Sequence, residues 1–160
     1  MSLRVGIGVD AHAFSDEAPL LLGGVEVPGE PGLAGHSDGD VVAHALVDAV
    51  LGAAGLGDIG SFFPSDEEEW EDASSLLFLE RAMAAVREAG FELVNADCVL
   101  VGERPRIAPL RAEMEARLAG ALGVEVGQVS VRATTTDGLG FTGRGEGLAT
   151  QAVALLASRL

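Results

Sequence analysis

Hydrophobic and polar residues alternate at the start of the chain, and the pattern changes several times further along. Residues 3–9 alternate and include β-branched side chains, which predicts a strand that ends at Asp10. Residues 20–27 are mostly aliphatic around the pair Gly23-Gly24, which predicts a short hairpin. Residues 28–39 are rich in Pro, Gly, Ser and Asp and are predicted to form a loop.

Three stretches carry helical signals. Apolar residues dominate 40–54, where Asp38 or a neighbour can cap a helix and Gly55 to Gly57 can end it. A second helix is predicted from the capping Ser74 to Ala89, with Gly90 after it. A third follows Pro105 and ends near 122–123. Residues 58–73 form a long polar segment that we expect to be a functional or mobile loop.

Two further strands are predicted, over 91–102 and 126–133. Residues 147–160 are ambiguous, because propensity favours a helix while a buried strand is also possible. Strands and helices that alternate in this way indicate an α/β or α+β fold. The chain has 160 residues and no evident repeat or linker, so we expect one domain over 1–160.

Charge and composition exclude several classes of function. The formal net charge is −15, and ten arginines with no lysine carry all the positive side-chain charge. No basic stripe is present, so nucleic acid is not an expected partner, and bound phosphate would need metal ions, backbone N–H groups or a few arginines. No apolar run reaches the roughly 18 residues of a membrane helix, and the start does not resemble a signal peptide. With the lone Cys98 in an apolar run, the sequence favours a cytoplasmic protein.

The three histidines suggest a metal site. Asp10 and His12 are two apart at a strand end, so both side chains can point to one face. His44 lies in an apolar helix and needs a partner there, and Asp40, His44 and Asp48 share one helix face. Carboxylate and imidazole are zinc ligands, and a catalytic zinc uses three and leaves one position open. A strand-end acid with ordinary buried or polar-face histidines is the alternative reading.

Other polar clusters occur at element ends. His36-Ser37-Asp38-Gly39-Asp40 precedes a helix and can offer N–H groups to an anion, or simply cap the helix. Asp58-Ile59-Gly60 can bind a substrate hydroxyl, or be an exposed loop. Thr134-Thr135-Thr136-Asp137 can hold phosphate and a hard cation, and Gly140 to Gly147 surround Arg144 with glycine, although each can be an ordinary turn.

Together these motifs, in this order over essentially the whole chain, resemble the 2-C-methyl-D-erythritol 2,4-cyclodiphosphate synthases, enzymes of the non-mevalonate route to isoprenoid precursors. The resemblance implies α+β subunits with a mixed four-stranded sheet and helices packed on one face. It also implies that the final segment is a strand, and that a homotrimer has its active sites between subunits. The implied reaction is that of a phosphorus–oxygen lyase: a 2-phosphate attacks the β-phosphorus of a CDP group within one substrate molecule, and CMP leaves.

The resemblance also implies roles for particular residues. Zn²⁺ would be held by Asp10, His12 and His44, and Mg²⁺ or Mn²⁺ would bridge the α- and β-phosphates. His36 and Thr135 would position the phosphates and stabilise the transition state. The CDP-linked methylerythritol phosphate would contact Asp10, His12, His36, Ser37, Asp58, Ile59, Gly60, Phe63, Gly102, Arg106, Ile107, Ala108, Ala133, Thr134, Thr135, Thr136, Asp137, Phe141 and Arg144.

The sequence departs from the family pattern at two places. Asp137 stands where glutamate is common, and Phe63-Pro64-Ser65-Asp66-Glu67 replaces a commoner Phe-Pro-Asp-Thr-Asp. Arg144 can serve the substrate or line a cavity on the trimer axis that accepts a prenyl diphosphate. Two other functions are open: a zinc phosphohydrolase with Asp40 or Asp48 as general base, and a non-catalytic trimer with a structural zinc.

Overall fold

A computed structural model describes residues 1–35, 37–64, 66–70 and 73–159 of the chain. The strands are β1 (Leu3–Ser15), β2 (Leu20–Leu22), β3 (Val25–Val27), β4 (Gly32–Leu33), β5 (Phe91–Val101), β6 (Val129–Thr134) and β7 (Gly147–Ser158). The helices are α1 (Val41–Ala54), α2 (Ile59–Phe62), α3 (Ser75–Glu88), α4 (Arg111–Leu122) and α5 (Gly140–Gly143). Single 3₁₀ turns lie at Glu68–Trp70, Ala108–Leu110 and Val126–Gln128.

The main sheet of the described chain has five strands in the order β4-β1-β7-β5-β6, and β2 and β3 form a separate two-stranded hairpin. β5 and β6 run parallel and the other neighbours antiparallel, so the mixed sheet of an α+β fold is confirmed. The predicted count of four strands was wrong by one edge strand. β4 is only two residues long and lies inside the segment 28–39, whose Pro/Gly content indicated a loop. It pairs with Phe14 and Ser15 at the end of β1.

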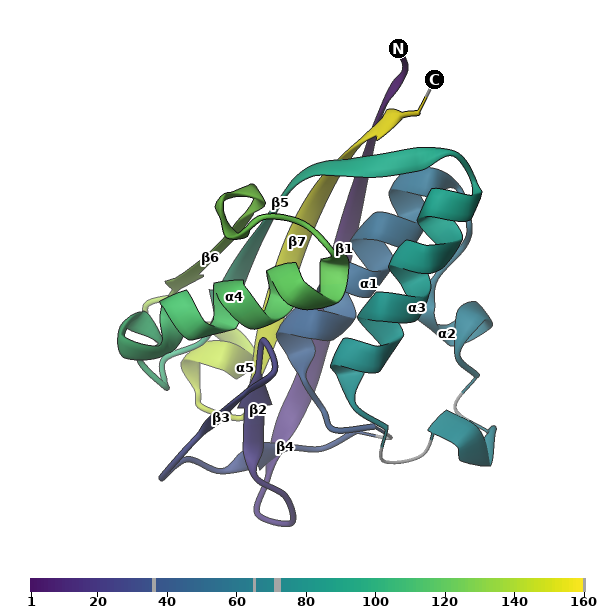
Figure 1. The fold of residues 1–160 in the computed structure, drawn as a ribbon. Coiled ribbons are helices and arrows are strands. Elements are labelled where there is room, and N and C mark those ends of the chain that lie inside the picture. Colours follow the sequence, from purple (N-terminus) through teal and green to yellow (C-terminus); the bar gives the residue numbers. More distant parts are fainter. Residues whose placement is uncertain (36, 65, 71–72, 160) are drawn as a thin grey trace.

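The first and last strands of the described chain, β1 and β7, pair along most of their length. β1 continues past its predicted end at Asp10, because β7 pairs with it from Leu3↔Ala157 to Ala13↔Gly147. The ambiguous last segment is therefore a strand, and it lies between β1 and β5. Backbone pairing on both sides outweighs the helical propensity of its alanines and leucines. In Figure 1 the purple β1 and the yellow β7 run side by side, and both chain ends lie together.

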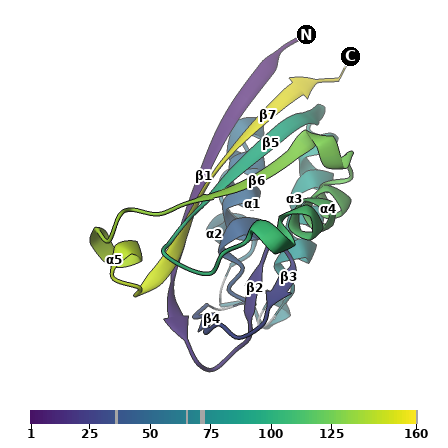
Figure 2. The same ribbon diagram turned by 90° about the vertical axis from the view of Figure 1, so that its left-hand side faces the viewer.

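The helices cover one face of this sheet. Figure 2 looks onto the strands, with α1 and α3 behind them. Residues of β7 that face the helices, such as Leu148, Ala152 and Leu156, are fully buried, while Val153 on the opposite face is 42% exposed. The core therefore lies between the sheet and α1, α3 and α4, while described residues on the opposite face of the sheet, such as Val153, are exposed.

Helix α1 is fixed at both ends and lies very close to β1. Asp40 caps its start, and Gly55 ends it in the left-handed conformation at φ 72°. Gly6 and Gly8 face the helix, where an added Cβ would collide with the backbone carbonyls of Ala49 and Ala45. These two glycines therefore allow the helix axis to approach the strand, and they set which turn of α1 lies over which residue of β1.

Two other segments differ from the predictions made from the sequence. The predicted loop 58–73 contains the short helix α2 and a 3₁₀ turn, while Ser74 caps α3 as predicted. After Pro105 the helical region starts as the 3₁₀ turn Ala108–Leu110 and becomes α4 only at Arg111. Within the described ranges, none of the helices combines the length and the apolar character needed to cross a bilayer.

Candidate metal centre and substrate site

Asp10, His12 and His44 meet where β1 approaches the start of α1. Asp10 and His12 alternate with exposed residues of β1, so both side chains point toward the helix. Because Ala45 lies against Gly8, the preceding residue His44 reaches the next positions along the strand. The sequence spacing placed Asp10 and His12 together, and the close approach of helix and strand adds the third side chain.

Three donor atoms converge there, all within 4.8 Å of one another. Asp10 Oδ2 lies 2.8 Å from His12 Nε2 and 3.2 Å from His44 Nδ1. His12 Nε2 and His44 Nδ1 are 3.4 Å apart, and the rings meet edge to face. His44 is 9% exposed, while Asp10 and His12 are half-buried and face solvent on one side.

This arrangement fits a tetrahedral metal ion. Bonds of about 2.0–2.1 Å to nitrogen and oxygen ligands around a tetrahedral zinc place neighbouring donors roughly 3.3 Å apart. The observed separations of 3.2 and 3.4 Å lie close to that value, and only the Asp10–His12 separation is shorter. One carboxylate and two imidazoles, with one partly open side, form a donor set that suits zinc.

Interactions among these side chains shift the pKa values of Asp10 and His44 in opposite directions. Burial works to raise the pKa of Asp10, but hydrogen bonds with His12 and His44 outweigh it and lower the pKa to about 2. Burial works to lower the pKa of His44, but the hydrogen bond and charge of Asp10 outweigh burial, so the pKa is raised. Asp10 and His44 therefore each stabilise the charged form of the other.

The far side of the His44 ring contacts the loop before α1 and the start of α3. His44 Nε2 lies 2.7 Å from Ser75 Oγ and 2.9 Å from Ser37 Oγ. The ring also stacks on Phe78, with centroids 6.1 Å apart. His44 is therefore held on both its edge and its face. The contact with Ser37 joins the predicted metal site to a predicted substrate residue.

The other two acids on that helix face serve the fold. Asp40 is fully buried and accepts hydrogen bonds from Gly23, Gly24, Val42 and Ala43 N–H groups. Burial outweighs these bonds and raises the pKa of Asp40 to about 6. Asp48 accepts a hydrogen bond from the Ile59 N–H at 2.7 Å, and burial raises its pKa as well.

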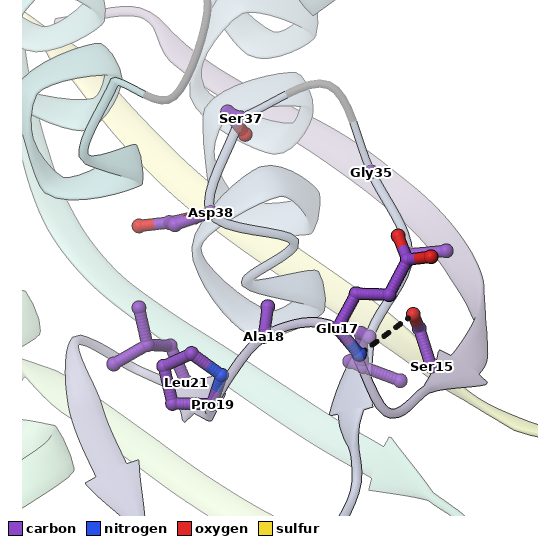
Figure 3. Close-up of a pocket in the computed structure, with 10 residues that line it drawn as sticks. Ser15, Glu17, Ala18, Pro19, Leu21, Gly35, Ser37 and Asp38 are labelled. Carbon is purple, nitrogen blue, oxygen red and sulfur yellow. Dashed lines mark hydrogen bonds between the residues drawn. The ribbon is translucent and has the colours of Figure 1, made fainter.

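A cavity of about 380 Å³ adjoins the loop before α1. Figure 3 shows Ser37 and Asp38 from that loop, and Ser15 and Glu17 from the end of β1 and the turn after it. Ser37 thus contacts His44 and also borders this cavity. His36, which was predicted to stabilise the transition state, lies outside the described residues.

Of the residues around α2 that are predicted to contact substrate, some lie at the surface and one lies in the core. Asp58 is exposed and caps α2 by accepting the Ser61 N–H at 2.8 Å, which lowers its pKa. Ile59 and Gly60 follow in the first turn of α2. Phe63 is only 6% exposed and stacks on Phe78 at 4.6 Å, so its side chain belongs to the core behind His44. Direct substrate contact by these residues stays a prediction.

Several of the residues expected to contact the CDP-linked substrate gather at a second place. A cavity of about 190 Å³ at the ends of β5 and β6 is lined by seven of them: Gly102, Arg106, Ile107, Ala108, Ala133, Thr134 and Thr135. Glu103, Pro105 and Arg111 complete the lining. Two distant segments, 102–111 and 133–135, are brought together because β5 and β6 are parallel neighbours.

The remaining predicted residues follow β6. Thr135 and Asp137 are exposed and contact each other through the Asp137 N–H, 3.3 Å from Thr135 Oγ1. Asp137 adopts a positive φ of 54°, and Thr136 Oγ1 donates to the Leu139 carbonyl at 2.6 Å. Beyond them, Phe141 in α5 is 43% exposed, and Arg144 forms an exposed ion pair with Glu146 at 3.0 Å.

Two polar residues near the cluster had no sequence signal. Ser75 stands beside the helix cap Ser74, and nothing in the spacing relates it to His44. Thr150 pairs with Asp10 in the sheet register, is 1% exposed, and its hydroxyl has no hydrogen-bond partner among the described residues. Only the tertiary fold brings either of them to the site.

Comparison with known proteins identifies the family. A profile of the YgbB family matches residues 3–157. A 2-C-methyl-D-erythritol 2,4-cyclodiphosphate synthase from Rubrobacter xylanophilus is 58% identical over 156 residues, which is 96% of this chain and 94% of the relative. The chain belongs to this family of synthases. The resemblance read from its motifs is therefore confirmed, and the chain is an enzyme of this family.

Solved structures agree with this assignment. The bifunctional IspDF from Campylobacter jejuni superimposes with a TM-score of 0.94 at 42% identity, covering 98% of this chain and 42% of that longer one. An IspF structure from Plasmodium falciparum, described as a CDP complex, gives 0.86 at 30% identity, with 99% and 98% covered. The synthase fold therefore extends over almost the whole chain.

Proposed function

We propose that this synthase converts 4-diphosphocytidyl-2-C-methyl-D-erythritol 2-phosphate into 2-C-methyl-D-erythritol 2,4-cyclodiphosphate and CMP. An oxygen of the 2-phosphate attacks the β-phosphorus. A new phosphorus–oxygen bond closes an eight-membered ring, and the bond from the β-phosphorus to the oxygen of CMP breaks. Family membership supports this reaction, and the convergence of Asp10, His12 and His44 is the observation that carries its metal dependence.

Asp10, His12 and His44 would hold the zinc ion through one oxygen and two nitrogens. A bound zinc would supply a Lewis acid that withdraws charge from a phosphate oxygen. The protein itself then has mainly to hold both reacting ends in line, which removes an entropic barrier of roughly 7–11 kcal/mol at best. We assign this positioning to the Thr135 hydroxyl and to His36, with Ser37 and Asp58 contacting the methylerythritol part.

A homotrimer with sites between subunits is part of the proposal. Ala11, Ala149, Val101 and Thr134 form one register row across the sheet. Three strand spacings of about 4.8 Å separate the metal cluster from the Thr134 cavity within one chain, roughly 14 Å in all. A site between subunits would bring the metal cluster of one chain beside the nucleotide cavity of the next.

The open face of the sheet supports the same assembly. Val5, Ile7 and Val9 of β1 point away from the helices and are 71%, 60% and 61% exposed. Val94 and Val153, on β5 and β7, are also exposed. A contiguous apolar surface of this kind is typical of a subunit interface. Copies of this chain would bury it.

Phosphate charge is the reason to expect a second cation. The substrate carries three phosphoryl groups, while the chain has a net charge of −15. Mg²⁺ binds through carboxylate and phosphate oxygens, and the exposed Asp137 next to Thr135 offers such a carboxylate. We therefore propose that Asp137 and the substrate phosphates would hold Mg²⁺ or Mn²⁺, which would neutralise part of the phosphate charge. The proposal also includes a cytoplasmic location and a single domain over residues 1–160.

The phosphohydrolase alternative has less support. It needs a free general base near the metal, and Asp40 and Asp48 were the candidates. Asp40 is fully buried under four N–H donors, and Asp48 holds the N–H of Ile59 at the start of α2. Asp40 therefore cannot activate water without losing its contacts, and Asp48 already uses one of its two oxygens to hold the start of α2. A closed structural zinc would need a fourth protein ligand, and the group of donors in the described chain has three.

Elemental analysis and product analysis test the proposal together. The purified protein should carry one zinc per chain, His44→Ala should carry almost none, and Asp16→Asn, which changes an exposed acid beyond β1, should match the parent. Mass spectrometry after incubation with the CDP-linked substrate should detect the cyclic diphosphate and CMP. A linear phosphate product would favour the hydrolase, and full zinc content in His44→Ala would refute the ligand assignment.

A further inference from the structure

The two ring nitrogens of His44 face different surroundings. Nδ1 faces Asp10 Oδ2 at 3.2 Å, on the side of the metal cluster. Nε2 faces the opposite way and lies 2.7 Å from Ser75 Oγ. A neutral imidazole carries one N–H, so the nitrogen that holds the hydrogen decides whether the other has a lone pair free for a metal. His44 can bind a metal through Nδ1 only in the Nε2–H form.

Ser75 is arranged to accept that hydrogen. It is the first residue of α3 and is fully buried. Its hydroxyl donates to Asp38 Oδ1, and its backbone N–H donates to Asp38 Oδ2 at 2.8 Å. Because the hydroxyl proton is directed at the carboxylate, the oxygen lone pairs of Ser75 remain for His44 Nε2–H. The Asp40 N–H also donates to Asp38 Oδ1, at 3.1 Å, and keeps that carboxylate in place.

The same end of α3 restrains the ring in a second way. Phe78, three residues after Ser75, stacks on His44 with an interplanar angle of 27°. Ser37 also reaches Nε2, at 2.9 Å, but it lies in the loop beside the open cavity and is a proposed substrate contact. The Ser75 contact is enclosed in the core and does not depend on substrate.

We propose that Ser75 and Asp38 are positioning residues that hold His44 in the Nε2–H form and so direct its Nδ1 toward the metal. The chain of hydrogen bonds runs from His44 Nε2 to Ser75 Oγ and from Ser75 Oγ to Asp38. Partners of this kind orient metal-binding histidines, and their loss typically costs 10- to 100-fold in metal affinity. This inference rests on the metal centre of the proposed function.

Ser75→Ala tests the inference, with Ser74→Ala as the matched control. The zinc dissociation constant of the full-length protein is measured by competition with a chromophoric chelator. Ser75→Ala should weaken zinc binding roughly 10- to 100-fold, because the buried Nε2–H loses its acceptor. Ser74 Oγ instead accepts from the Leu76 N–H at 3.3 Å and caps α3. Ser74→Ala should lower stability while zinc affinity stays within about threefold of the parent.

The outcomes separate this inference from the metal centre itself. If the parent binds zinc and Ser75→Ala binds it equally well, the positioning role is wrong and the metal centre stands. If Ser74→Ala weakens zinc as much as Ser75→Ala, the effect belongs to the helix start, and the positioning role is again wrong. If the parent takes up no zinc, the metal centre fails and the inference fails with it.

A spectroscopic measurement on the parent protein does not depend on any variant folding. Nitrogen-15 NMR of the zinc-loaded protein should show the His44 Nε2 as protonated and its Nδ1 as metal-bound. A purely structural role for Ser75 would not fix this pattern. The reverse pattern, with zinc on Nε2 and hydrogen on Nδ1, would overturn the proposal.

Discussion

The carboxylate of Asp40 joins the start of α1 to the β2–β3 hairpin, because its Oδ2 accepts the Gly24 N–H at 2.7 Å. Its other oxygen accepts the Gly23 N–H at 2.9 Å and caps the helix through Val42 and Ala43. One fully buried side chain therefore fixes where α1 begins, one turn before His44. The cap and the metal ligand lie on the same helix face, but their functions differ.

Asp40→Ala should lower the free energy of unfolding by about 3 kcal/mol, because it removes a helix cap and leaves buried N–H groups without an acceptor. Urea denaturation followed by circular dichroism measures this change. The exposed Asp16, changed to alanine, should shift stability by less than about 0.5 kcal/mol. An equally small effect for Asp40→Ala would contradict the structural role.

Gly8→Ala should disturb the metal site without touching a ligand. Its Cβ would collide with the Ala45 carbonyl and push α1 away from β1, which moves His44 from Asp10. We expect a loss of about 3 kcal/mol in stability and a clear drop in zinc affinity. Gly127→Ala is the control, because an added Cβ there meets no atom within 4 Å. Parent-like zinc binding by Gly8→Ala would argue against the close helix–strand approach.

With zinc removed by a chelator, the contribution of the Asp10–His44 pair to folding stability should pass through a maximum as pH changes. The folded pKa of Asp10 is lowered to about 2, so its contribution is present above its ordinary value near 3.8 and is lost as pH falls toward 2. The folded pKa of His44 is raised, so its contribution is present below about 6.5 and is lost as pH rises through the folded value. The stability difference between parent and His44→Gln should therefore peak between about pH 4 and 6.5.

Denaturant titrations with a chelator present, repeated across this pH range, measure the difference. With zinc present, the stability difference between parent and His44→Gln should rise instead of fall above pH 6.5, because zinc competes with protons for the histidine nitrogens. A flat profile in the chelated protein would show that the pair does not interact.

Ile7→Asp should separate the subunits. It places a charge in the centre of the exposed apolar row of β1, where burial in an interface would be costly. Light scattering after gel filtration should give trimers for the parent and monomers for the variant. Val126→Asp, at a residue that is 49% exposed in a turn away from the sheet face, should remain trimeric. Monomers in the parent protein would reject the assembly.

Thr135→Ala should lower kcat roughly 100-fold and change KM by less than about threefold, because a donor aimed at developing charge acts mainly in the transition state. Steady-state kinetics measures both constants. Thr135→Ser keeps the hydroxyl and should recover most of the loss. An unchanged kcat in the alanine variant would remove Thr135 from the catalytic group.

Local patterns predicted the parts of the fold that depend on local chemistry. The apolar run after Asp40, the cap at Ser74 and the i, i+2 spacing of Asp10 and His12 each act over a few residues. The last strand was ambiguous locally, because its conformation comes from pairing with β1 and β5 on either side. Ser75 was missed for a similar reason, as 31 positions separate it from His44 along the chain.

The position of β7 has a consequence for how the protein is made. Leu3 pairs with Ala157, so β1 receives its inner neighbour only after the other strands of the sheet have been synthesised. Until then β1 and β5 have no strand between them, and the aliphatic residues around the gap are open to aggregation. Contacts of such long sequence separation form slowly. We expect the nascent chain to depend on chaperones until β7 has emerged from the ribosome.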